Sequence, residues 1–425
     1  MILKLSIIVV LLFFSQSVYA QTIQVLNESQ LNFGLEDKIL VENHLTFNPA
    51  KPQHLLLSGM YVDSKDSNKY GNFAVASFDN GETWNKPNLF EIPEGADPWG
   101  IITKKGNALT TVLGYEELFL FRSENGGNDW NEKPLNLGKY HDHQTMVQDT
   151  IRDIIYLVSI KGNDIYVNYS KDDGITFNNP NIYKFSNLSA NTMTPIILAD
   201  GTLLVSFTTF NRPAIGGSRN NGKAERLNKT LSWTIPFSIS DGFGTPLFLS
   251  ESCETGFPVM VNDQSESDFK DNIYYVCSTQ TQQSVVFHYS NTESRSWSAG
   301  YSLFPYTKGE KEPRNPFTGI PQLTVNNKGI IGIIWQDRTE DDEHKCQYLY
   351  FSASVDGGKT FKKPIKVSSE LSCMENPKND WAGKRYKSGG DYTGFIADKN
   401  GDFIIIWPDS RNGISKLYKA KVRVK

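Results

Sequence analysis

One segment of eight residues recurs along the chain, and this repeat limits the possible folds more than any other feature. Each clear copy begins with Ser, carries Asp, Asn, Glu or Gly near its middle and ends with Trp or Phe. The four clear copies start at Ser77, Ser123, Ser170 and Ser354, and two weaker copies start at Ser238 and Ser290. A spacing of about 46 residues between the early copies is typical of a four-stranded propeller blade, so we predict an all-β β-propeller.

The chemistry of the repeat is that of a tight turn. Asp and Ser side chains hydrogen-bond to the backbone of a chain reversal, and Gly adopts conformations that other residues resist. The aromatic residue at the end of each copy packs between neighbouring sheets, and the aromatic content of 12% agrees with β structure. We therefore interpret the aspartates of the repeat as structural.

The strands around the repeats indicate how many blades form the ring. After the last copy, residues 392–397, 402–407 and 415–424 are three predicted strands of a further blade that lacks a fourth. Residues 22–26 can supply that strand and remove the open edge of the sheet. We favour seven blades closed by this N-terminal strand, with six blades as the alternative, in one domain over residues 21–425.

The first twenty residues differ from the rest of the chain. Lys4 precedes an apolar run over residues 5–14, and residues 15–20 end in a small-residue pattern. This arrangement predicts a signal peptide over residues 1–20 and a secreted or periplasmic protein, with a membrane anchor as the alternative. No later apolar run reaches the roughly 18 residues of a spanning helix, so we expect no integral membrane segment.

The net charge limits the possible binding partners, and the cysteine content predicts disulfides. The formal net charge of −4 argues against a nucleic acid partner, which calls for a basic surface. In an exported protein the four cysteines predict the disulfides Cys253–Cys277 and Cys346–Cys373, with four reduced thiols as the alternative. We expect a monomer without a cofactor. The acidic run over residues 340–343 is interpreted as a solvated loop, with a calcium site as the alternative.

The longest polar loops are predicted to lie on one face of the ring. They cover residues 211–230, 306–319, 338–345 and 371–390. Binding and catalytic residues concentrate in such loops on a rigid scaffold, so this face is the candidate functional face.

The repeat resembles the Asp box of sialidases, and the resemblance extends over nearly the whole chain. Residues 333–338 with 349–361, and residues 389–395 with 407–413, look like secreted bacterial proteins of the sialidase-like family. The resemblance implies a glycoside hydrolase that acts on acidic glycans, with exo-sialidase as the closest activity. Family members bind the substrate carboxylate with three arginines, use a tyrosine paired with a glutamate as nucleophile, and use an aspartate as acid and base.

Arginines for such a carboxylate clamp follow the second strands of the last two predicted blades. Arg338 and Arg411 occupy matching positions, and each has an aspartate beside it. The candidates for substrate binding are Arg314, Arg338, Arg385 and Arg411, with the neighbouring Asp337 and Asp409. The alternative is an Asp–Arg pair that only fixes a loop.

The entry to the last predicted blade carries a candidate nucleophile. Asp391 and Tyr392 enter the strand that lines the central channel. Tyr392 can attack an anomeric carbon if a base accepts its proton, and Glu116 and Glu117 are the candidate partners. The alternative is a packed or hydrogen-bonded tyrosine.

Corresponding positions of the second and third blades carry further candidates. Asp97 is a candidate acid and Trp99 a candidate sugar-stacking platform, with a core tryptophan as the alternative. His141 and His143 are candidate general bases or metal ligands, with a hydrogen bond across the channel as the alternative. Alternation along a strand places the two histidines on opposite faces, so we expect no metal shared between them unless the segment is a loop.

Three functions fit these residues. The first is the glycoside hydrolase that the resemblance implies, with a glycan as partner. The second is a polysaccharide lyase, in which His141 or His143 acts with Tyr392 to remove the proton beside a uronic acid carboxylate. The third is a propeller that binds carbohydrate or protein without catalysis.

Overall fold

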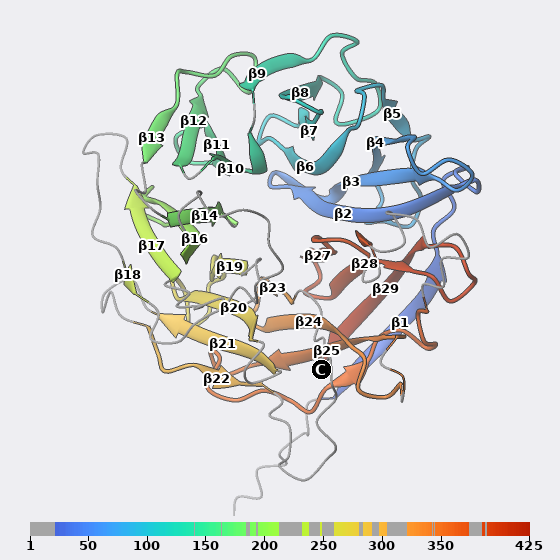
Figure 1. Cartoon of the computed structure of the whole chain (residues 1–425). Coiled ribbons are helices and arrows are strands. Elements are labelled where there is room, and N and C mark those ends of the chain that lie inside the picture. Colours follow the sequence, from blue (N-terminus) through green and yellow to red (C-terminus); the bar gives the residue numbers. More distant parts are fainter. Residues whose placement is uncertain are drawn as a thin grey trace, which may run out of the picture.

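Seven small antiparallel sheets stand in a ring in the part of the chain that the computed structural model describes (Figure 1). That part comprises residues 22–139, 141–162, 164–183, 188–192, 194–211, 232–237, 247–248, 259–279, 284–290, 297–303, 321–341, 343, 345–373, 385–386 and 389–425. Each sheet is one blade, and the prediction of an all-β propeller is confirmed. Among the described segments there is no helix of sufficient length and apolar character to cross a membrane.

The first four sheets follow the chain in order. The first contains β2 (Lys38–Asn48), β3 (Lys51–Asp63), β4 (Tyr70–Ser77) and β5 (Asn88–Phe90). The second contains β6 (Ala96–Ile102), β7 (Ala108–Leu113), β8 (Glu117–Ser123) and β9 (Leu135–Lys139). The third contains β10 (Asp142–Asp149), β11 (Ile154–Lys161), β12 (Asp164–Ser170) and β13 (Asn181–Tyr183). The fourth contains β14 (Leu188–Thr192), β15 (Ile196–Ile197), β16 (Leu203–Asn211), β17 (Ser232–Phe237) and β18 (Leu247–Phe248).

The last three sheets complete the ring. The fifth contains β19 (Val259–Asn262), β20 (Ile273–Thr279), β21 (Ser284–Ser290) and β22 (Tyr301–Ser302). The sixth contains β23 (Gln322–Val325), β24 (Ile331–Asp337), β25 (Tyr348–Ser354) and β26 (Ile365–Lys366). The seventh contains β27 (Gly394–Ala397), β28 (Phe403–Asp409), β29 (Lys416–Val424) and, as its outer strand, β1 (Ile23–Gln30).

The N-terminal strand closes the last blade, as the sequence predicts. β1 runs antiparallel to β29, with Ile23 opposite Val424 and Gln30 opposite Tyr418. The strand is longer than the predicted residues 22–26. Because β1 covers the outer edge of β29, the last sheet has four strands, as most of the other sheets do.

The first strands of neighbouring blades contact one another at the centre of the ring (Figure 1). β2 lies between β6 on one side and β27 on the other, and β6 also contacts β10. The space between blades is filled by apolar side chains, such as Phe351 and Phe403, whose ring centroids lie 5.2 Å apart. Residues from both ends of the chain therefore meet around the inner strands.

The repeated segments are turns whose carboxylates bond to their own backbone. The Ser77 hydroxyl donates to Asp79 Oδ1 at 2.8 Å and accepts from the Gly81 amide at 2.8 Å. The Thr83 hydroxyl donates to the other Asp79 oxygen at 2.5 Å. Equivalent hydrogen bonds form around Asp172 and Asp356. These aspartates have a structural role, as the sequence predicts.

One predicted disulfide is present, and the other includes a cysteine outside the described residues. Cys346 and Cys373 form a disulfide with an S–S distance of 2.04 Å, which confirms that pairing. Cys253, the partner predicted for Cys277, lies outside the described residues.

Candidate functional site

Three inner strands share an unusual backbone feature at the same place. The pairing of β2 with β3, of β6 with β7 and of β10 with β11 shifts register just before the regular part of each inner strand. Each bulge contains one non-glycine residue with positive φ: Glu42 at 45°, Asp97 at 49° and His143 at 47°. Such a conformation re-aims the side chain relative to a regular strand. We call Glu42, Asp97, Asp142, His143, Arg385, Asp391 and Tyr392 the inner-strand cluster.

Arg385 joins two carboxyl groups of the cluster. Its Nη1 donates to Asp391 Oδ1 at 3.2 Å, and its Nη2 donates to Asp391 Oδ2. The same Nη2 lies 3.7 Å from Glu42 Oε1, which also accepts from the Asp391 amide at 3.4 Å. Glu42 is 1% exposed, and within the described residues its Oε2 has no hydrogen-bond partner.

A glycine makes room for the Glu42 side chain. Gly390 has a φ of 98°, and a Cβ atom there would lie 2.0 Å from Glu42 Cγ. The preceding Gly389 accepts a 2.8 Å hydrogen bond from the Glu42 amide. The segment before β27 is therefore fitted closely against the bulge of β2.

Burial and like charge shift two carboxyl groups of the cluster, those of Glu42 and Asp97, toward their neutral forms. Burial, followed by the charge of Asp391, raises the pKa of Glu42 to about 8, although Arg385 opposes the shift. Burial, followed by the charge of Glu42, raises the pKa of Asp97 well above its ordinary value. A carboxyl group that keeps its proton near neutral pH can donate it in a reaction.

Tyr392 lies among these carboxyl groups and stays a neutral phenol. Burial, followed by the charges of Asp97 and Glu42, raises its pKa well above the ordinary value. Its ring meets Trp99 edge-on, with 5.9 Å between the centroids. The surroundings therefore suit a hydrogen-bond donor better than a tyrosinate nucleophile.

Trp99 is a core residue. It is 8% exposed, its Nε1 donates to the Met146 carbonyl at 3.1 Å, and His44 stacks on it with 3.8 Å between the ring centroids. Burial lowers the pKa of His44 to about 3. The structure matches the core alternative for Trp99 rather than an open sugar-stacking platform.

The two candidate histidines lie in different environments. His143 belongs to the inner-strand cluster, with its Nε2 3.9 Å from Asp142 Oδ2. His141 is buried inside its blade, where its Nδ1 lies 2.8 Å from the Ser159 hydroxyl and its ring meets Tyr166 edge-on. Of the two, only His143 belongs to the inner-strand cluster.

The two glutamates predicted as proton acceptors for Tyr392 lie outside the inner-strand cluster, and Glu42, which belongs to it, was not predicted. Glu116 pairs with Lys139 at 3.5 Å, and Glu117 accepts a 2.9 Å hydrogen bond from Asn136. Glu42 is the glutamate of the cluster. The sequence signal that could have found it is the blade alignment, since residues 41–44, 96–99 and 142–145 are equivalent and place Glu42, Asp97 and His143 in one position.

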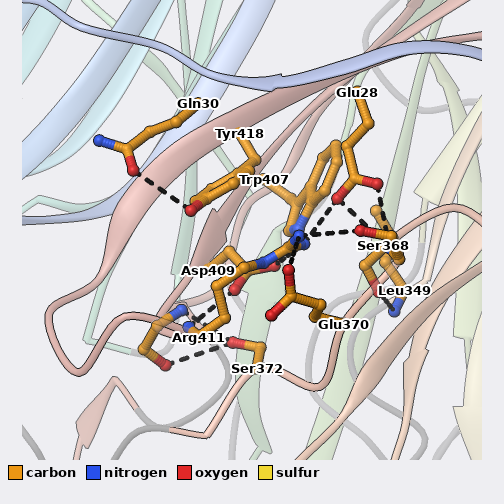
Figure 2. A network of polar contacts seen from close by, with 12 residues as sticks. Glu28, Gln30, Leu349, Ser368, Glu370, Ser372, Trp407, Asp409, Arg411 and Tyr418 are labelled. Carbon is orange, nitrogen blue, oxygen red and sulfur yellow. Dashed lines mark hydrogen bonds and ion pairs between the residues drawn. The ribbon is translucent and has the colours of Figure 1, made fainter.

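Arg411 belongs to a network at the outer part of the last blade (Figure 2). Its Nη2 lies 2.7 Å from Glu28 Oε1 on β1 and 2.7 Å from Asp409 Oδ2 on β28. Its guanidinium lies 4.3 Å from the centroid of Tyr418, and its side chain is 6% exposed. The structure shows the Asp409–Arg411 pair in the loop-fixing role that was the alternative to substrate binding.

The other members of the predicted carboxylate clamp are not brought to Arg411 by any described contact. Both Nε and Nη2 of Arg338 donate to Gln347 Oε1 at 3.3 Å, and Asp337 accepts from the Thr339 amide at 2.7 Å. Arg314 lies outside the described residues. Arg385 is the arginine that the structure places in the inner-strand cluster.

The predicted functional loops are described only in part. Most of residues 211–230 and 371–390, and all of 306–319, lie outside the described residues. In the acidic run, Glu340 bonds to Tyr350 and Lys366, while Asp342 also lies outside the described residues.

Comparison with known proteins shows the fold. No protein-family model and no curated protein sequence matches the chain. The structure is similar to an ulvan lyase of polysaccharide lyase family PL25 bound to -[GlcA(1-4)Rha3S]-, at 13% identity and a TM-score of 0.56 over 92% of this chain and 95% of that one.

Two further solved structures are similar. YCF48 bound to a D1 peptide has 11% identity and a TM-score of 0.50 over 93% of this chain and 94% of that one. The Hadza microbial sialidase Hz136 has 14% identity and a TM-score of 0.47 over 92% of this chain and 68% of that one. The first two share the propeller fold with this chain.

Proposed function

We propose that the protein is a glycoside hydrolase that uses the inner-strand cluster as its active site. The observation that carries the proposal is the pairing of two unlike carboxyl groups on Arg385. Glu42 keeps its proton to about pH 8, and the Asp391 carboxylate is held by two hydrogen bonds from the guanidinium. A proton donor next to a carboxylate is what glycoside hydrolysis requires.

The geometry assigns a role to each group. Asp391 attacks the anomeric carbon as the bond to the glycosidic oxygen breaks, and Glu42 gives its proton to that oxygen. Water, deprotonated by Glu42, then hydrolyses the glycosyl ester of Asp391, while Arg385 orients both carboxyl groups. The Glu42 and Asp391 carboxyl groups both contact Nη2 of Arg385. They are therefore closer together than the roughly 6.5–9.5 Å of inverting enzymes, so the expected outcome is retention of configuration. Tyr392 supplies a neutral hydroxyl that donates a hydrogen bond to the sugar.

A substrate panel tests the proposal. The protein is incubated with sialyl-lactose, with a uronic acid polysaccharide and with neutral oligosaccharides, and released reducing sugar is measured. Sialyl-lactose tests the exo-sialidase activity that the Asp-box resemblance implies. Turnover of at least one glycan is expected, and the absence of turnover on all of them by folded protein would favour a binding propeller and overturn the proposal.

Matched variants test the assigned residues. Glu42→Gln and Asp391→Asn are each expected to lower kcat by about 10²–10⁴-fold, because each removes one half of the acid and nucleophile pair. Glu116→Gln is the control, since Glu116 lies on the surface beside Lys139. Full activity of Glu42→Gln, with its fold intact by circular dichroism, would rule out Glu42 as the proton donor.

A polysaccharide lyase is the second candidate, because both His143 and Tyr392 lie in the cluster. In this reaction a base removes the proton beside a uronic acid carboxylate and an acid protonates the leaving oxygen. The products then have unsaturated ends that absorb in the ultraviolet. Such absorbance with the uronic acid polysaccharide, without incorporation of solvent oxygen, would select the lyase over the hydrolase.

We also propose export and a monomeric state, on the basis of residues 1–20 and the ring closed by β1. N-terminal sequencing of the mature protein is expected to begin at Gln21. Light scattering is expected to give the mass of one mature chain.

A further inference from the structure

Three side chains of the inner-strand cluster, together with the neighbouring Gln144, carry the donor atoms of a metal site. We propose that Asp97, Asp142, His143 and Gln144 bind one divalent cation. This site goes beyond the proposed hydrolysis, because none of the four residues is assigned as proton donor or nucleophile. Its donors come from β6 and β10, which contact each other.

Three of the donors already lie close together. One ligand atom each from Asp97, Asp142 and His143 lies within 4.8 Å of the other two. Metal–ligand distances of about 2.0–2.6 Å place neighbouring donor atoms roughly 3–4.5 Å apart, so small side-chain rotations suffice. The two bulges fix this approach, because Asp97 and His143 hold the same positive φ on adjacent strands.

Gln144 supplies an independent observation. Its side chain is buried at 0% exposure, and its Nε2 donates to the Asp97 backbone carbonyl, which places the amide group beside Asp97. Within the described residues its Oε1 has no hydrogen-bond partner. A buried amide oxygen normally accepts a hydrogen bond, and a hard cation satisfies it equally well.

Charge favours a cation at this place. The cluster contains the carboxyl groups of Glu42, Asp97, Asp142 and Asp391, and its guanidinium, Arg385, is committed to Asp391 and Glu42. Asp97 and Asp142 are therefore left without that counter-charge. Two carboxylates, one imidazole and one amide oxygen suit Mn²⁺ or Zn²⁺ better than Ca²⁺, which prefers six or more oxygens.

Calorimetric titration of the chelator-treated mature protein tests the site. MnCl₂, ZnCl₂ and CaCl₂ are titrated separately, and one equivalent of Mn²⁺ or Zn²⁺ is expected to bind, with a rise in Tm as the ion concentration passes Kd. Tight binding of Ca²⁺ alone would overturn the assignment of the cation. Absence of binding by all three ions at millimolar concentration would overturn the site.

Variants connect the binding to the named donors. Asp142→Asn is chosen because Asp142 is exposed, so its replacement is expected to leave the fold intact, and His143→Gln removes the nitrogen ligand. Each is expected to raise Kd at least tenfold, while Glu116→Gln leaves it unchanged. Pulsed electron paramagnetic resonance of the Mn²⁺-bound protein is expected to show a histidine nitrogen coupling that His143→Gln abolishes. Unchanged Kd values in both cluster variants would refute the assignment.

The binding test is separable from the test of hydrolysis. Glu42→Gln is expected to abolish turnover and to keep its affinity for the ion within about threefold, since Glu42 is not a ligand. Ion binding without any glycan turnover would leave the site standing and refute the hydrolase.

Discussion

The network around Arg411 is expected to stabilise the ring by tying its first strand to its last blade. Arg411 lies between Glu28 on β1 and Asp409 on β28, and both Arg411 and Asp409 are buried. Replacing Arg411 with Met keeps most of the side-chain volume and removes the charge. Glu28 and the buried Asp409 then face each other without a counter-charge.

The size of this effect follows from burial. Removing one partner of a buried pair costs about 3–5 kcal/mol, whereas an exposed pair is worth roughly 0–1 kcal/mol. At about 2.1 cal/mol/K of unfolding entropy per residue, a chain of this length loses roughly 5 °C in Tm for 4 kcal/mol. Arg423→Met is the matched control, because Arg423 pairs with Asp402 in the same blade but is 44% exposed.

Urea and thermal unfolding, followed by tryptophan fluorescence, measure the difference between the two variants. Arg411→Met is expected to lower the free energy of unfolding by several kcal/mol more than Arg423→Met does. The triple variant Glu28→Gln, Asp409→Asn, Arg411→Met should recover most of the loss, because no charge is left unpaired. Equal losses in Arg411→Met and Arg423→Met would refute the reasoning.

Three further predictions concern the cluster and its supports. If Glu42 is the proton donor, kcat is expected to fall about tenfold per pH unit above roughly pH 8, the pKa of Glu42, and a flat alkaline limb in the pH–rate profile would contradict this. The pKa of His44 is lowered to about 3, so the stability that its neutral form contributes is complete above pH 6.5 and is lost as the pH falls toward 3. In urea titrations, His44→Gln is expected to reduce the drop in the free energy of unfolding between pH 7 and pH 5 by about 2 kcal/mol. Gly390→Ala is expected to lower the free energy of unfolding by about 1–3 kcal/mol and kcat more than tenfold, because the new Cβ displaces the Glu42 side chain. An active, fully stable variant would show that the segment before β27 adapts freely.

The fold was predictable because its signal is local and repeated. Each turn is built within eight residues around an aspartate such as Asp79, and the period between turns gives the blade. The Cys346–Cys373 disulfide was predictable for the same reason, since the two residues are neighbours among the cysteines. The closing role of the N-terminal strand followed from counting strands.

The candidate site was less predictable because it depends on register and on distant partners. Glu42 was missed because its orientation follows from a bulge, which a sequence read as regular alternation does not reveal. Arg411 was assigned to substrate because its partner Glu28 lies at the other end of the chain. Asp97, His143, Asp391 and Tyr392 could be named as candidates because each lies at the entry to an inner strand of its blade.

The pairing of β1 with β29 has a consequence for synthesis. Residues 23–30 leave the ribosome long before their partner strand, which ends at Val424, so β1 has no native neighbour until β29 has been made. A circular permutant that begins after β1 and carries this strand at its C-terminus would turn the slowest pairing into a local hairpin. The refolding rate of this permutant, compared with that of the natural chain, would measure how much the pairing of β1 with β29 slows folding.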